Sequence, residues 1–335
     1  MTTTCRLTAA RMVAPGKGIL AADESIGTMS ARLQAVGVEP SAENRRKYRE
    51  LLASAPGLAE DVSGIIFCDE TLRQNFSDGT PFAQAVTALG ILPGIKVDTG
   101  AKPCPGLPGE TVTEGLDGLP ARLAEYAELG AAFAKWRAVF RISSDTPSRG
   151  AIRVNASALA RYAAACQEAG LVPIVEPEVL MDGDHNHGVC RELTSQVQTA
   201  VRSELAALNV DLSGIVLKPN MVLEGAEHGR RSTPAEVAEL TVGVLRAWPG
   251  DLAGVAFLSG GQPPERATAN LEAMQSHSTP WPLTFSFGRA LVSPALEAWR
   301  GEAAREADAQ AVLLERVAAN GAAARLRGEA QPVTV

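Results

Sequence analysis

Short apolar segments rich in β-branched residues recur along the whole chain and alternate with segments of helical periodicity. Their nearly continuous hydrophobicity is typical of parallel strands that are buried on both faces. Eight such strands alternating with helices predict an α/β fold of the TIM (β/α)8 barrel type, and a doubly wound open sheet is the alternative. The eight predicted strands span residues 18–23, 64–70, 94–98, 133–142, 172–180, 214–220, 254–261 and 283–289.

The segments between these strands contain the turn and capping residues that helices require. Gly130 and Gly170 each follow a periodic segment and predict the end of a helix. Thr233 before Pro234 predicts an N-cap followed by proline at the first helical position. The clearest helices span residues 116–130, 156–170, 189–208 and 232–248.

Two further helical patterns fall outside the alternating core of the fold. One covers about residues 31–53, and an alanine-rich one runs from Ser293 to about Arg327. We expect extra N-terminal helices and a C-terminal helical extension that packs on the outside of the barrel. No linker or internal repeat interrupts the pattern, so we expect a single barrel domain over residues 1–328 and a short flexible tail over 329–335.

Composition narrows the class of protein. The formal net charge of −7 argues against nucleic-acid binding, which usually requires a basic surface. No run of about 20 apolar residues predicts a membrane span, and the N-terminal segment lacks the apolar region of a secretory signal. The five cysteines are dispersed and form no CxxC pair, which indicates free thiols in a reducing compartment. We therefore expect a cytoplasmic protein.

Lysine is scarce, and its few positions are informative. Only six of the 31 basic residues are lysines, and three of them, Lys96, Lys135 and Lys218, lie at predicted strand ends. Catalytic groups of this barrel fold come from those ends, and charged residues within apolar strands are unfavourable unless they face a polar centre. The polar and glycine residues at the strand ends are, in order, Asp23, Glu70, Lys96, Lys135, Arg137, Glu176, Glu178, Lys218, Ser259, Gly260, Gly261 and Arg289.

Lys218 directly follows the apolar residues 215–217. Apolar surroundings and a nearby cation such as Lys135 both favour a neutral amine, which could condense with a ketone. A purely structural salt bridge from Lys218 to Glu176 or Glu178 is the alternative.

Strand periodicity assigns the charged residues to faces. Phe133, Lys135 and Arg137 share one face of their strand, and Trp136 lies on the other. By the same rule Glu176 and Glu178 share a face. A carboxylate among lysines could shuttle protons, although simple charge balance would also explain the pattern.

Two further segments suggest ligand binding. Residues 259–261 and Arg289 follow the last two strands, where this fold often binds phosphate, although a tight turn would explain the glycines equally. The segment 182–187 contains two aspartates and two histidines that could bind a metal. Because His228 and His277 lie away from the strand ends, we interpret that segment as a polar loop.

Several long motifs resemble those of class I fructose-bisphosphate aldolases of the animal and plant type. The resemblance extends from about Arg11 to Asn320. It implies reversible cleavage of fructose 1,6-bisphosphate to dihydroxyacetone phosphate and glyceraldehyde 3-phosphate, without a cofactor or metal. The matching motifs span residues 14–25, 43–52, 94–98, 115–119, 133–137, 172–178, 217–221, 257–262 and 285–290.

The resemblance also implies residue roles. Lys218 would form a Schiff base with the C2 ketone, Glu176 would act as acid and base in its formation, and Asp23 would accept the C4 hydroxyl proton. Lys135 would stabilise charge and orient Glu176. Lys96 and Arg137 would contact hydroxyls or phosphate, and Glu178 is also implied to bind substrate. The residues implied to bind the C1 phosphate are Ser259, Gly260, Gly261, Gly288 and Arg289, and those implied to help bind the C6 phosphate are Ser25, Thr28 and Arg32.

The chain departs from the family pattern at two points. The C-terminal segment to Val335 contains no tyrosine, so the proton exchange that a terminal tyrosine assists in animal members is not expected here. Thr99 also stands where the family usually has lysine. The resemblance suggests a homotetramer. A metal-dependent lyase or hydrolase that uses residues 182–187, or a non-catalytic phosphosugar-binding scaffold, is the alternative function.

Overall fold

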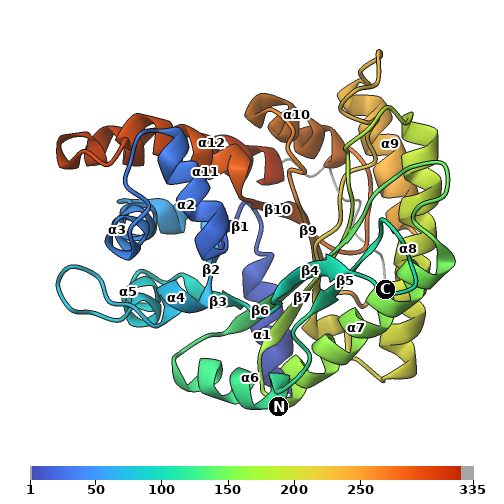
Figure 1. Cartoon of the computed structure of the whole chain (residues 1–335), viewed down its shortest axis with the longest axis horizontal. Coiled ribbons are helices and arrows are strands. Elements are labelled where there is room, and N and C mark those ends of the chain that lie inside the picture. Colours follow the sequence, from blue (N-terminus) through green and yellow to red (C-terminus); the bar gives the residue numbers. More distant parts are fainter. Residues whose placement is uncertain (1, 326–335) are drawn as a thin grey trace, which may run out of the picture.

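Eight parallel strands close a barrel in the computed structural model, which describes residues 2–325 (Figure 1). β1 pairs with β2 on one side and with β10 on the other, so the sheet is closed and the open-sheet alternative is wrong. All eight predicted strands are confirmed. Around the barrel they are β1 (Gly18–Ala22), β10 (Leu283–Phe287), β9 (Gly254–Phe257), β8 (Val216–Leu217), β7 (Val172–Val179), β6 (Phe133–Phe140), β3 (Leu92–Lys96) and β2 (Val62–Phe67).

Alternation along the strands builds two apolar layers. Phe133 belongs to the layer inside the barrel, whereas Trp136 belongs to the larger layer between the strands and the surrounding helices. There the Trp136 ring lies 5.5 Å from that of Tyr162 on α7 (Arg149–Glu168). The predicted division of β6 into two faces is therefore confirmed.

Glycines make room for aromatic rings on both faces of the barrel strands, Phe133 inside the barrel and Phe285 in the outer layer. A Cβ atom on Gly94 would come within 2.2 Å of the Phe133 ring, and one on Gly18 within 2.4 Å of the Phe285 ring. Real Cβ atoms do not approach other atoms so closely, and a packed interior cannot absorb the added volume without strain. These glycines are therefore required by packing rather than by backbone conformation.

Helices surround the barrel. Gly130 and Gly170 follow two of them with φ angles of +98° and +76°, as predicted. Thr233 caps the N-terminus of α9 in a reciprocal capping box with Glu236. The remaining helices are α1 (Thr2–Met12), α2 (Ile26–Ala35), α3 (Ala42–Ala53), α4 (Asp69–Leu72), α5 (Phe82–Ala88), α6 (Leu119–Glu128), α8 (His187–Ala207), α9 (Pro234–Leu245), α10 (Pro264–Met274), α11 (Arg289–Trp299) and α12 (Glu306–Arg325), with short 3-10 turns at Leu58–Glu60, Leu212–Gly214 and Ala303–Arg305.

The two helical extensions are each divided in two. The predicted segment 31–53 forms α2 and α3, and the segment from Ser293 forms α11 and α12. The second division follows Arg300 and Gly301, whose φ angles of +48° and +77° end the helix. α12 packs against α10, α11 and the outside of β10 and β1, as predicted. The predicted tail at 329–335 lies outside the described residues.

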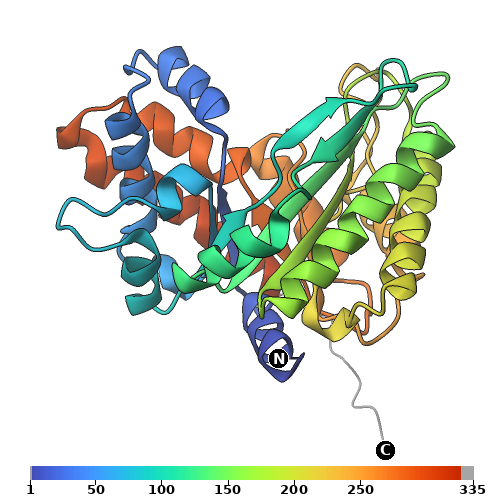
Figure 2. The ribbon, with the colours of Figure 1, turned by 60° about the horizontal axis from the view of Figure 1, so that its bottom comes forward.

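The helix α1 and an antiparallel hairpin were not predicted. α1 contributes Cys5, Ala9 and Met12 to the apolar layer inside the barrel. The hairpin joins β4 (Gly100–Pro103) to β5 (Thr111–Glu114). In Figure 2 α1 lies at the bottom, whereas the hairpin and α2 lie at the top, at the opposite end of the barrel. Among residues 2–325, no helix has both the length and the apolar composition to cross a membrane.

Candidate active site

A cavity of about 440 Å³ opens at the carboxyl ends of the barrel strands. Its walls include residues of α2 and of the hairpin, and also the exposed Thr99, which directly precedes β4. Every predicted site residue lines the cavity except Gly261. The predicted residues that line it are Asp23, Ser25, Thr28, Arg32, Lys96, Lys135, Arg137, Glu176, Glu178, Lys218, Ser259, Gly260, Gly288 and Arg289.

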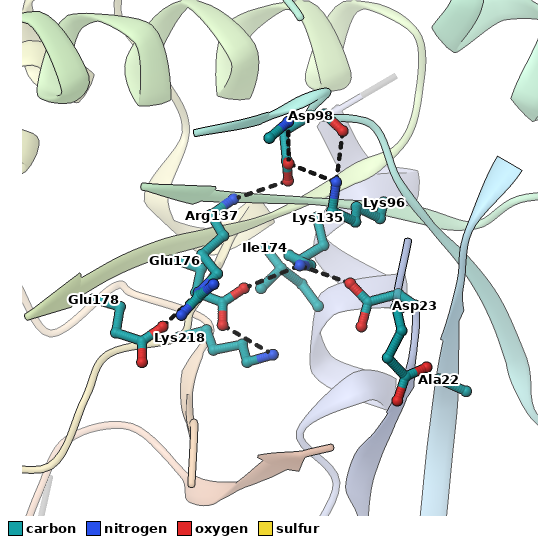
Figure 3. Close-up of polar contacts among 12 residues, drawn as sticks. Ala22, Asp23, Lys96, Asp98, Lys135, Arg137, Ile174, Glu176, Glu178 and Lys218 are labelled. Carbon is teal, nitrogen blue, oxygen red and sulfur yellow. Dashed lines mark hydrogen bonds and ion pairs between the residues drawn. The ribbon is translucent and has the colours of Figure 1, made fainter. Parts of the chain in front are cut away.

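Two lysines and two carboxylates alternate at the centre of the cavity (Figure 3). The Lys135 Nζ atom lies 2.6 Å from Asp23 Oδ2 and 3.4 Å from Glu176 Oε2. The other oxygen of Glu176, Oε1, lies 3.2 Å from the Nζ atom of Lys218. Lys135 therefore separates the two carboxylates, and Glu176 separates the two lysines.

The register of the strands explains this alternation. Lys135 of β6 lies opposite Ile174 of β7, and Glu176 follows two residues later on the same face. Lys218 immediately follows β8, the next strand around the barrel, and its backbone N–H donates to the Val175 carbonyl. Side chains from three neighbouring strands thus converge because each occupies an inward position at its strand end.

Burial and charge have opposite effects on the central ionisable groups. Burial raises the pKa of Asp23, but the lysines 135, 218 and 96 outweigh it and lower that pKa to about 2. Burial also raises the pKa of Glu176, and Lys218, Lys135 and Arg137 lower it below its ordinary value. Burial disfavours the charge on Lys135, yet Asp23 and Glu176 raise its pKa. The three groups are therefore charged at neutral pH.

A second layer of ion pairs surrounds this centre. Arg137 Nε donates to Glu178 Oε2 at 2.5 Å, joining β6 to β7. Lys96 Nζ lies 2.6 Å from Asp98 Oδ1 and donates to the Asp98 carbonyl at 2.7 Å. Asp98 Oδ2 in turn accepts the backbone N–H of Arg137 at 3.2 Å. Four cations and four carboxylates thus neutralise one another in the buried part of the site (Figure 3).

Asp98 is a site residue that the sequence reasoning missed. It closes the predicted strand 94–98, from which the strand-end pattern predicts only Lys96 as a site residue. Its side chain is 3% exposed and binds Lys96 and the backbone of Arg137 at the same time. The two-residue period of a strand could have identified it, because Asp98 follows Lys96 by two residues and so belongs to the same face of the predicted strand.

One end of the cavity is suited to an anion. Gly260 and Gly261 have φ angles of +60° and +89°, and Ser259 before them is buried. Arg289 is the first residue of α11, so the N-terminus of that helix also faces the cavity. Within residues 2–325 Arg289 makes no ion pair. Gly261 itself is exposed and does not line the cavity, although a Cβ atom on it would come 3.0 Å from Arg289 Nη2.

A second group of anion-binding candidates comes from α2. Ser25 caps this helix by accepting the Thr28 N–H at 3.2 Å. Arg32 is already engaged, since its Nη1 atom donates to Glu24 Oε1 at 2.5 Å. Glu24 lines the cavity and was also missed, although it directly follows Asp23.

A buried hydroxyl completes the lining. Ser286 on β10 is 1% exposed, and its Oγ atom has no hydrogen-bond partner among the described residues. It lines the cavity, whereas sequence reasoning took only Gly288 and Arg289 from this segment. Buried polar groups usually have a partner, so this hydroxyl is a candidate for contact with a bound molecule.

Two other sequence candidates lie outside the cavity. Glu70, a predicted strand-end residue, pairs instead with Arg45 on α3 at 2.6 Å because β2 has already ended at Phe67. In the segment 182–187, His187 Nδ1 shares a 2.9 Å hydrogen bond with Ser232 Oγ. No group of three or more histidine, cysteine, aspartate or glutamate side chains within the described residues is arranged to hold a metal ion.

Comparison with known proteins covers nearly the whole chain. A family model described as class-I fructose-bisphosphate aldolase matches residues 5–332. A probable fructose-bisphosphate aldolase class 1 of Xanthomonas axonopodis pv. citri is 53% identical over 95% of this chain and 96% of its own length. Fructose-bisphosphate aldolase C-B of Danio rerio is 51% identical over 95% of this chain and 88% of its own length.

A solved structure supports the same relationship. Fructose-bisphosphate aldolase from Plasmodium falciparum, crystallised with TRAP and a small-molecule inhibitor, superposes with a TM-score of 0.95 at 44% identity. The superposition covers 96% of this chain and 94% of that chain.

Proposed function

The chain belongs to the class I fructose-bisphosphate aldolase family, and we propose that its cavity cleaves fructose 1,6-bisphosphate reversibly through a Schiff base on Lys218. The products are dihydroxyacetone phosphate and glyceraldehyde 3-phosphate. The observation that carries the assignment is the contact between Lys218 and Glu176, 3.2 Å apart, beside a second carboxylate in the same cavity.

Glu176 moves the protons of Schiff-base formation. The Lys218 ammonium first passes a proton to the Glu176 carboxylate, and the neutral amine then attacks the C2 carbonyl carbon. After the second nitrogen proton reaches the former carbonyl oxygen, Glu176 returns its proton to that hydroxyl, which leaves as water. One ammonium and one ketone thereby become one iminium and one water, and Glu176 ends as a carboxylate.

Asp23 is the base for carbon–carbon cleavage. It accepts the C4 hydroxyl proton, the C3–C4 bond breaks, and the bonding electron pair moves into the iminium to form an enamine. The aldehyde product is glyceraldehyde 3-phosphate. Protonation of the enamine at C3 and hydrolysis then release dihydroxyacetone phosphate. The iminium receives the electron pair, so the chemistry requires no metal.

Lys135 holds the two carboxylates apart and keeps them ionised. Its ammonium lies 2.6 Å from Asp23 and 3.4 Å from Glu176, and its raised pKa keeps it charged. Two carboxylates this close would otherwise repel each other, and one would take up a proton. Lys135 therefore preserves both a base for C4 and a proton acceptor for Lys218.

The two ends of the cavity bind the two phosphates. Ser259, Gly260, Gly288 and Arg289 suit the C1 phosphate because they combine backbone N–H groups, a helix N-terminus and a guanidinium that has no ion pair among residues 2–325. Gly261, with its φ angle of +89°, continues the turn that follows Gly260 at this end. The C6 phosphate is suited by Ser25, Thr28 and Arg32. The sugar hydroxyls between the two phosphates are suited by Lys96, Arg137 and Glu178.

A coupled cleavage assay tests the function. The parent protein is expected to release glyceraldehyde 3-phosphate from fructose 1,6-bisphosphate in the presence of EDTA, whereas Lys218→Arg should lose turnover by several orders of magnitude because arginine cannot supply a neutral amine. Comparable turnover in both proteins, or loss of the parent's activity in EDTA, would contradict the proposal.

The assembly and cellular location follow from the same relationship. We propose a homotetramer on the basis of the family resemblance, and analytical ultracentrifugation tests it. We also propose a reducing, cytoplasmic location, which the free thiols of all five cysteines support. Fractionation of the source cells tests that placement.

A further inference from the structure

A buried arginine donates hydrogen bonds to the backbone carbonyls of the residues on both sides of Asp23. Arg49 lies on α3, is 1% exposed and does not reach the cavity lining. Its Nε atom donates to the Ala22 carbonyl at 2.9 Å, and its Nη2 atom donates to the Glu24 carbonyl at 2.8 Å. A single guanidinium therefore binds the carbonyl of the residue before Asp23 and the carbonyl of the residue after it.

These two hydrogen bonds lie just beyond the end of β1, where pairing between strands no longer holds the backbone. β1 ends at Ala22, so Asp23 lies beyond the last ladder position, before α2 begins at Ile26. The guanidinium is planar and rigid, and its donors are fixed relative to one another. Two bonds to the Ala22 and Glu24 carbonyls restrict the backbone rotations of Asp23 and Glu24 between them, and so they limit the directions in which the Asp23 carboxylate can point.

The same guanidinium is connected to the proposed C6 phosphate site. Arg49 Nη2 also contacts Glu24 Oε2 at 3.2 Å, and Glu24 Oε1 accepts from Arg32 Nη1 at 2.5 Å. Glu24 thus lies between a buried arginine and a cavity arginine. Arg49 touches neither the cavity nor Lys218, so any effect on the reaction must pass through Asp23 or Glu24.

We propose that Arg49 is a positioning residue for carbon–carbon bond cleavage, which it serves by holding the Asp23 carboxylate in place through the two flanking carbonyls. The inference rests on the proposed function of Asp23. Formation of the Schiff base uses Lys218 and Glu176, which Arg49 does not contact, so the two stages of the reaction should respond differently to its removal.

The test compares cleavage with Schiff-base formation in Arg49→Met and Arg49→Lys. Cleavage is measured as kcat for fructose 1,6-bisphosphate. Schiff-base formation is measured as the fraction of protein labelled by dihydroxyacetone phosphate and borohydride. Small displacements of catalytic groups lower rates by as much as about 100-fold. Arg49→Met should therefore lower kcat about 10- to 100-fold while labelling stays within about 2-fold, and Arg49→Lys should recover part of kcat.

Arg45 provides a matched control on the same helix. It is also a buried arginine, 7% exposed, but its bonds go to Glu70, Ser30 and the Pro40 carbonyl. Arg45→Met removes a comparable guanidinium from α3 without touching β1, and its kcat should stay within about 3-fold of the parent. A loss equal to that of Arg49→Met would show a general effect of helix packing and overturn the proposal.

A double mutant tests whether Arg49 acts on cleavage through Asp23. In an Asp23→Asn background the base is absent, so adding Arg49→Met should lower the residual kcat by no more than about 3-fold. Equal losses in both backgrounds, or parallel losses of labelling and cleavage in Arg49→Met, would contradict the proposal. Failure of the parent to label or to cleave would instead contradict the proposed function.

Discussion

Lys135 offers a quantitative test of the electrostatics of the site. Its ammonium lies 2.6 Å from Asp23 and 3.4 Å from Glu176 and is almost fully buried. At an effective dielectric constant of about 20, the two attractions are about 6 and about 5 kcal/mol. Burying the three charges offsets much of this energy. Removing the shared partner leaves two buried carboxylates close together, and such a removal costs about 3–5 kcal/mol.

The variant Lys135→Met should therefore lower the free energy of unfolding by about 3–5 kcal/mol at pH 7. In the parent, the lowered pKa of Asp23 gives stability that is present above its unfolded pKa of 3.8 and is lost only as pH falls toward about 2. In the variant, burial without Lys135 raises the pKa of both carboxylates, so they take up protons at higher pH. The difference in stability should therefore be smaller at pH 4.5 than at pH 7.

Urea denaturation followed by circular dichroism at both pH values measures this difference. Lys102→Met is the matched control, because Lys102 is exposed on the hairpin and makes no ion pair within the described residues. The control should unfold like the parent at both pH values. The electrostatic reasoning fails if Lys135→Met is as stable as the parent at pH 7, or if its deficit grows on acidification.

Two further variants separate the chemical step from phosphate binding. Glu176→Gln should slow borohydride labelling by dihydroxyacetone phosphate at least 100-fold, because a carboxamide cannot carry protons to and from Lys218; labelling at the parent's rate would remove Glu176 from the mechanism. Arg289→Ala should raise the KM for fructose 1,6-bisphosphate about 10- to 100-fold through loss of a charge-assisted contact, with a smaller change in kcat. Steady-state kinetics measure the KM and kcat of the variant. Arg191→Ala, on the exposed face of α8, is the control. An unchanged KM in Arg289→Ala would argue against the phosphate site.

Local pattern predicted the barrel and most of the site. Buried parallel strands have a distinctive apolar composition, and the two-residue period assigns each inward side chain, so Lys135, Arg137, Glu176 and Glu178 could be placed on one face before any coordinates were known. The same reasoning failed for Glu70, because a polar residue after a strand can turn outward, and this one pairs with Arg45.

The features that were missed depend on contacts between distant segments. α1 has a mixed, polar sequence, and its apolar positions acquire meaning only inside the barrel. The hairpin strands are short, and Asn155 of α7 holds β5 in place by accepting from the Thr113 N–H and donating to the Thr111 carbonyl. Arg49 belongs to a helix whose pattern gives no reason to associate it with Asp23. Such contacts depend on tertiary structure, and the periodicity of a local sequence segment does not predict them.

The central claim is that the Lys218 nitrogen bonds to the substrate carbon. Borohydride reduction of the protein mixed with dihydroxyacetone phosphate, followed by proteolysis and mass spectrometry, tests it directly. One modified residue, Lys218, is expected, and no modification is expected in Lys218→Arg. A label on Lys135 or Lys96, or no label on a protein that cleaves the sugar, would contradict it.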